Sequence, residues 1–168
     1  MIKTLSGYLT PSRIIEAEER LSRSLADLFQ RMFKLEVTAV DLPPNRHFDV
    51  ISASITLEHE TTLSCVFILI PKEVAALIAR QAGVDSALYD SVPIVQDITC
   101  EIVNIVGNNL RAYFSEAIGI SFKLGRPTPG FGDLLSLRSS DIKLHFQIKS
   151  HNPIELGFMY GESSENRK

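Results

Sequence analysis

Two long segments with helical periodicity divide the chain into halves of the same plan. Apolar residues recur at helical spacing from Thr10 to Lys34, and a second helix is predicted from Pro93 to Ala117. Each segment is followed by a turn with two prolines, "DLPPN" in the first half and "RPTPG" in the second. This order predicts an internal duplication of a helix, a short strand and two long strands, with a short helix at 72–83 joining the halves.

The strand-like segments indicate a sheet with one face against the helices. "ISASITLE" and "DIKLHFQIKS" alternate apolar and polar residues, as half-buried strands do. "LSCVFILIP" is apolar on both faces and is predicted to be a central strand. "PIELGFMY" is expected to pair as the last strand, and "ISFKLGRPTPGFGD" to hold a short one. We therefore expect an α/β (α+β) fold, with two long helices packed on a mixed, largely antiparallel sheet.

Length and composition favour one domain. The chain has 168 residues, of which 45% are hydrophobic, enough for a single core. We expect this domain to span residues 1–160. The remaining segment, 161–168, reads "GESSENRK" and is expected to be a disordered polar tail.

Charge and hydropathy argue against several classes of partner. The formal net charge is −3, which offers no attraction for nucleic acid or an anionic membrane. No apolar run reaches the roughly 18 residues of a membrane-spanning helix, and the N-terminus lacks the apolar region of a secretory signal. Cys65 and Cys100 lie in apolar stretches and are expected to be free, buried thiols. These features predict a cytoplasmic protein.

Most common catalytic signatures are missing from the sequence. The four histidines have no metal-ligand spacing with cysteines or carboxylates, so no metal site is predicted. Neither a P-loop, nor a GxGxxG motif, nor a Gly-x-Ser-x-Gly motif occurs.

A narrow polar stripe runs along the predicted helix at 93–117. Glu101 and Asn104 lie one turn apart on it, and Asp97 and Asn108 share the same face. Every surface helix needs a solvated stripe, which is the simplest interpretation. Asparagine is, however, a poor helix former, and two of them on one stripe have a cost without an evident structural benefit.

The spacing of this stripe resembles a known signature. Asp97, three residues, Glu101, two residues, Asn104, then 22 residues and Pro127 match the motif of the CheC/CheX/FliY phosphatases, bacterial proteins that dephosphorylate the chemotaxis response regulator CheY. The duplicated helix-strand unit and the chain length are also similar to this family. One departure lies at Asn108, where family members often have glycine, and Gly107 stands just before it.

The first helix carries no complete copy of the motif. Counting back from Pro44 places Glu18 at the Glu position, Leu21 at the Asn position and Ile14 at the Asp position. Counting back from Pro43 gives Ala17 and Arg20 for the pair. In either register the amide is missing, so the chain resembles CheX-like members, which have one site.

The resemblance implies a reaction and a role for each residue. The substrate would be the aspartyl phosphate of a CheY-like receiver domain, already held by the receiver's own Mg²⁺ and lysine. Asn104 would orient the attacking water, and Glu101 would dock to that lysine. Asp97, Asn108 and Pro127 would support the site or contact the partner. A neutral amide suits this task because it adds no negative charge beside the phosphate. The resemblance therefore implies that the chain needs no nucleophile, metal site or cofactor of its own.

Two other functions stay open at this stage. The same helix could bind a receiver or a flagellar component without turnover, since the first helix shows that the scaffold tolerates loss of the motif. A structural protein without a receiver partner is the third possibility. The resemblance also implies a homodimer formed through the sheet. Long strands near the C-terminus would otherwise expose an edge, although Lys143 and Lys149 could protect it by charge.

Overall fold

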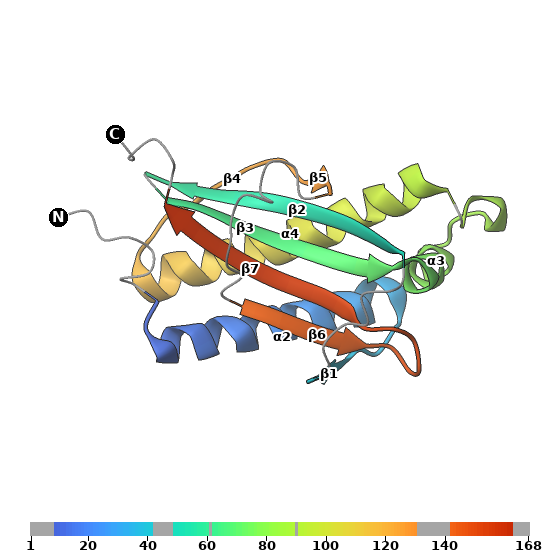
Figure 1. The fold of residues 1–168 in the computed structure, drawn as a ribbon, viewed down its shortest axis with the longest axis horizontal. Helices are drawn as coiled ribbons and strands as arrows, with labels where there is room; N and C mark the ends of the chain where they lie inside the picture. The colour runs from blue at the N-terminus through green and yellow to red at the C-terminus, as the bar shows by residue number, and fades with distance from the viewer. Residues whose placement is uncertain (1–8, 42–48, 61, 90, 131–141, 163–168) are drawn as a thin grey trace.

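A computed structural model describes residues 9–41, 49–60, 62–89, 91–130 and 142–162. Within them, two long α-helices lie on one face of an antiparallel sheet of seven strands, and a third, short α-helix lies at the end of the strands (Figure 1). The fold is therefore the α+β arrangement expected from the sequence.

The two long helices begin and end close to the predicted bounds. α2 spans Pro11–Phe33, and the Thr10 side chain accepts the N–H of Arg13 at its start. α4 spans Val92–Ile118 after Ser91, which makes no side-chain capping bond. The shorter α3, Lys72–Gln81, connects the two halves.

The strands are arranged symmetrically in the sheet, in the order β1-β6-β7-β3-β2-β4, with β5 also on β2. If the two halves of the chain are exchanged, the order reads the same from the other end, with β3 and β7 at the centre. This agrees with the predicted duplication, and β3 is the central strand that its apolar sequence indicated. The strands span Thr38–Val40 (β1), Val50–His59 (β2), Thr62–Pro71 (β3), Lys123–Leu124 (β4), Thr128–Pro129 (β5), Ile142–Gln147 (β6) and Ile154–Glu162 (β7).

One core fills the space between helices and sheet. The alternation of β2 directs Ala53, Ile55 and Leu57 into this core, while Ser52 and Thr56 lie on the opposite face. That opposite face has a small apolar cluster of its own, formed by Cys65, Phe67, Leu69 and Met159.

The last strand, β7, differs in two ways from what the sequence predicted. β7 runs to Glu162, two residues into the segment expected to be a tail, and residues 163–168 lie outside the described part of the chain. β7 also pairs with β3 on one side and β6 on the other, so it is an interior strand and not a free edge.

Among the described helices, none is long and apolar enough to cross a membrane.

Candidate functional site

The predicted polar stripe lies on the outer face of α4. Asp97 and Glu101 are exposed, and Asn104 and Asn108 are half-buried. The opposite face of the helix is buried against the sheet, as the helical periodicity indicated. That face consists of Val95, Thr99, Ile102, Val103, Val106, Leu110, Tyr113 and Phe114, together with Gly107 on one flank.

Gly107 lets the middle of α4 lie close to the sheet. A Cβ at this position would be 2.7 Å from Cγ2 of Ile55, which is itself buried in β2, and 3.7 Å from Cδ1 of Leu124 in β4. The distance to Ile55 is too short for a side chain unless Ile55 moves, and the distance to Leu124 is an ordinary van der Waals contact. The glycine that we noted one position before Asn108 therefore serves packing, and it seats the helix turn that carries the two asparagines.

Pro127 lies beside this flank, in a bulge of the sheet edge. Residues 125–127 stand opposite only Ile55 and Thr56 of β2, between the pairs Leu57–Leu124 and Ser54–Thr128. The Gly125 N–H donates to Thr56 O, and the Gly130 N–H donates to Ser52 O, each at 2.9 Å. Proline fits between these bonds because it has no N–H to donate. The structure thus places Pro127 at the edge next to α4, on a different element from the other four residues.

Glu101 has no hydrogen-bond or ion-pair partner among the described residues. Its exposed carboxylate is therefore available to a cation supplied by another molecule. Asp97, one turn earlier, lies near Cys100. Partial burial raises the pKa of the Cys100 thiol, and the Asp97 charge raises it further. Cys100 is half-buried instead of fully buried as we expected, and it stays a neutral thiol at pH 7.

The ends of the two long helices define how the halves correspond. Each helix ends at a residue in the left-handed conformation, Lys34 after α2 and Gly119 after α4. The N–H of Lys34 donates to Phe29 O, and that of Gly119 donates to Phe114 O. Lys34 and Gly119 are 85 positions apart in the chain, and so are the two acceptors, Phe29 and Phe114. Ser24 and Asn109 have the same separation, and they hydrogen-bond across the two helices at 2.6 Å.

This correspondence corrects the register that the prolines suggested. Glu16, and not Glu18 or Ala17, occupies the position equivalent to Glu101, and Glu19 stands where α4 has Asn104. Leu21 is 1% exposed and belongs to the core. Pro43 and Pro44 lie outside the described residues. The amide is still missing from the first half, as predicted, but a carboxylate replaces it.

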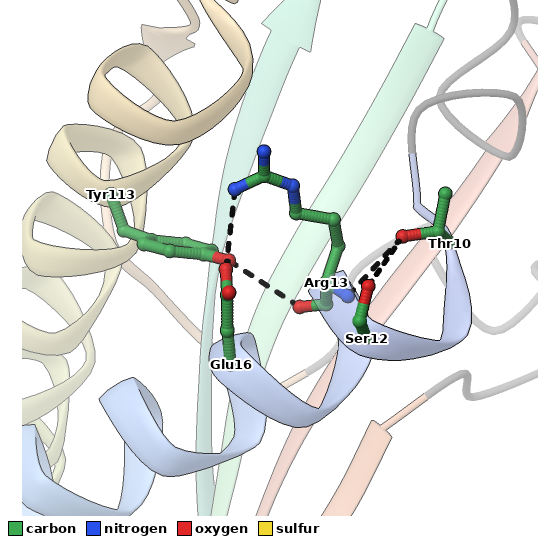
Figure 2. A network of polar contacts seen from close by, with 5 residues as sticks. All are labelled: Thr10, Ser12, Arg13, Glu16 and Tyr113. Carbon is green, nitrogen blue, oxygen red and sulfur yellow. Dashed lines mark hydrogen bonds and ion pairs between the residues drawn. The ribbon is translucent and has the colours of Figure 1, made fainter.

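Glu16 is also held in a network that Glu101 lacks (Figure 2). The Tyr113 hydroxyl donates to Glu16 Oε2 at 2.7 Å, and Arg13 Nη1 contacts the same oxygen at 3.2 Å. The Tyr113 hydrogen bond, aided by the charge of Arg13, lowers the pKa of the Glu16 carboxyl. In the second half the equivalent partners are Leu28 and Ile98, which cannot hydrogen-bond. At these equivalent positions, the carboxylate of Glu16 is therefore engaged within the chain, and that of Glu101 is available to another molecule.

Replacing Tyr113 with phenylalanine should raise the pKa of Glu16 towards its ordinary value. Because Glu16 titrates lower in the folded protein than in the unfolded chain, its contribution to stability is present above the unfolded pKa. It is lost as the pH falls through the folded pKa. The acid side of the stability profile should therefore flatten in Tyr113→Phe. Carbon-13 NMR titration of Glu16 measures the pKa directly, and Arg13→Gln should raise it less. An unchanged Glu16 pKa in Tyr113→Phe would contradict the network.

Sequence comparisons identify no relative: no protein-family model matches the chain, and no curated protein does. Comparison of structures gives clear matches. The fold is similar to a CheC-like superfamily protein from Shewanella sp. PV-4, with 16% identity, 88% of this chain and 98% of that chain covered, and a TM-score of 0.68. It is also similar to the chemotaxis protein CheX from Vibrio vulnificus, with 20% identity, 87% and 97% coverage, and a TM-score of 0.67.

A third match is a chain of a CheX-CheY-BeF₃-Mg²⁺ complex from Borrelia burgdorferi, with 16% identity, 86% and 97% coverage, and a TM-score of 0.63. These matches cover nearly the whole length of the similar proteins. At such low identity they establish the architecture and not the activity. The chain has the fold of the CheX and CheC-like chemotaxis proteins.

Proposed function

We propose that this chain is a CheX-like phosphatase, a hydrolase acting on the aspartyl phosphate of a CheY-like receiver domain. The observation that carries the proposal is the placement of Glu101 and Asn104 together on the outer face of α4, in the predicted motif, on a fold shared with CheX. A single site per chain fits the first half, where Glu19 replaces the amide and Glu16 is engaged by Tyr113.

The chemistry needs little from this chain beyond positioning. A water oxygen bonds to phosphorus while the bond from phosphorus to the receiver's aspartate oxygen breaks, and the aspartate leaves as a carboxylate. When bound, the receiver's own Mg²⁺ and lysine would supply the positive charge that neutralises the phosphoryl group. Asn104 orients the water through its neutral amide, and catalysis comes mostly from proximity. The water's protons pass to phosphate and solvent.

Glu101 has the task of docking. Its carboxylate is exposed and has no described partner within the chain, so an ion pair with a receiver lysine would break no internal contact. Asp97 adds a second carboxylate on the same face, and Pro127 lies at the neighbouring edge of the sheet. Together these residues form a surface at which α4 meets the receiver.

A single-turnover experiment tests the proposal. A receiver from the same organism is phosphorylated with a small-molecule phosphodonor and mixed with an excess of this protein in Mg²⁺. The rate constant for loss of the acyl phosphate should rise and saturate with protein concentration. Ser115→Ala, an exposed change on the same stripe, should behave as wild type. If no receiver of that organism loses phosphate faster, the proposed function is wrong.

We also propose that the protein forms a homodimer, as the resemblance implied. In the sequence, the reason for a dimer is an exposed edge formed by the C-terminal strands. That reason is weaker in the structure, because β7 is interior and β6 pairs with β1 along part of its outer side. Sedimentation at micromolar concentration is expected to show a species of twice the 18.7 kDa chain mass. A single species at the chain mass over this concentration range would exclude the dimer, without affecting the proposal for α4.

A further inference from the structure

The Asn108 side chain makes two hydrogen bonds to Asn104 on α4, one to its main chain and one to its side-chain amide. The Nδ2 of Asn108 donates to the main-chain oxygen of Asn104 at 2.9 Å and to the side-chain Oδ1 of Asn104 at 3.4 Å. Both side chains are half-buried, so water has limited access to the pair. These contacts are local, one helical turn apart, and they involve the residue that the proposed function places nearest to the attacking water.

The main-chain oxygen determines the orientation of Asn108. A carbonyl oxygen only accepts hydrogen bonds, and its second lone pair remains open after the helical bond is made. Asn108 must therefore turn its NH₂ group, and not its oxygen, towards Asn104. The two hydrogens on this nitrogen allow one donor group to serve both acceptors.

The orientation of Asn108 then determines that of Asn104. With an NH₂ group facing it, Asn104 must present Oδ1, because the flipped amide would bring two donors together without an acceptor. Its own NH₂ consequently faces away from Asn108. Oδ1 keeps one lone pair for a hydrogen of a water, and the Nδ2 hydrogens can donate to a phosphoryl oxygen.

We propose that Asn108 is a positioning residue that holds the Asn104 side-chain amide in the one orientation suited to its catalytic task. The benefit for the reaction rests on the proposed function. Asparagine is the residue type that fits: it reaches the carbonyl four positions back, and it carries two hydrogens on one nitrogen. Serine has a single hydrogen, and its preferred acceptor is the main-chain oxygen. Asparagine at position 108 lowers the intrinsic stability of the helix, and its hydrogen bonds to Asn104 give a reason for its presence there.

The test compares Asn108→Ser with wild type and with Asn109→Ser. The control changes the adjacent asparagine, which hydrogen-bonds to Ser24 and has no described hydrogen bond to Asn104. Nitrogen-15 relaxation of the Asn104 side-chain amide, assigned by its loss in Asn104→Ala, should show an ordered group in wild type and in the control. In Asn108→Ser the order parameter should fall. An unchanged order parameter would overturn the proposal.

Kinetics supply the second readout. In Asn108→Ser, kcat for phosphate loss should drop by about three- to tenfold, the range expected from releasing one rotamer-rich side chain. The Kd for a beryllium-fluoride-activated receiver should not change. A weaker Kd with unchanged kcat would show that Asn108 contacts the receiver instead, and would overturn the positioning role. An inactive wild type would remove the proposed function, while the relaxation data would still decide whether Asn108 orients Asn104.

Discussion

Replacing Asn104 with alanine is expected to lower the rate constant for receiver dephosphorylation by about 100-fold or more, because an in-line water would no longer be held in place. Asn104 is half-buried on the outer face, and the one hydrogen bond described for its side chain comes from Asn108. Removing it leaves the core intact. Affinity for the activated receiver should therefore stay close to that of wild type.

Glu101→Ala provides the contrast. It removes the docking carboxylate and should raise the Kd for the receiver, with a smaller effect on the dephosphorylation rate constant at saturation. Titration calorimetry with a beryllium-fluoride-activated receiver and single-turnover decay measure the two quantities separately. If Asn104→Ala retains both receiver binding and the biological effect while Glu101→Ala abolishes them, α4 belongs to a binding module without turnover. That outcome would favour the non-catalytic alternative.

The second large effect concerns the seating of α4. Phe114→Ala should lower the free energy of unfolding by about 3–5 kcal/mol, the usual cost of deleting a fully buried phenylalanine. Phe114 is 0% exposed, and its ring lies 5.4 Å from that of Phe122 and 5.5 Å from that of Phe158. The ring thus joins α4 to the chain that follows it and to the centre of the sheet.

Urea unfolding followed by circular dichroism measures this loss. The control is Ile15→Ala, which truncates an apolar residue on α2 that is 56% exposed. Exposed changes of this kind usually alter stability by no more than about 0.5 kcal/mol. If the two variants lose equal stability, Phe114 does not anchor α4 as the structure indicates.

The outer face of α4 could be predicted because helical periodicity is a local property. The positions of Asp97, Glu101, Asn104 and Asn108 on one face follow from spacing alone. The alternation in β2 and the apolar character of β3 predicted which residues enter the core for the same reason. These features depend on neighbours within a few residues.

The parts that sequence could not supply depend on contacts between distant segments. The prolines misplaced the first-half register because loop residues do not determine where a helix ends, whereas the left-handed residues Lys34 and Gly119 do. The bond between Tyr113 and Glu16 joins two helices and has no local signature. That β7 lies inside the sheet follows from pairing with β3, a partner more than 80 positions earlier in the chain.

If this chain is the phosphatase that we propose, each molecule turns over many phosphorylated receivers. The most direct measurement uses one molecule of protein for about ten of receiver, with continuous phosphodonor and Mg²⁺, and follows inorganic phosphate. We predict steady phosphate release well above that of the receiver alone, amounting to many turnovers per protein molecule, and its loss in Asn104→Ala. Release that equals the receiver's own rate, with binding to the receiver intact, would contradict the proposed phosphatase activity.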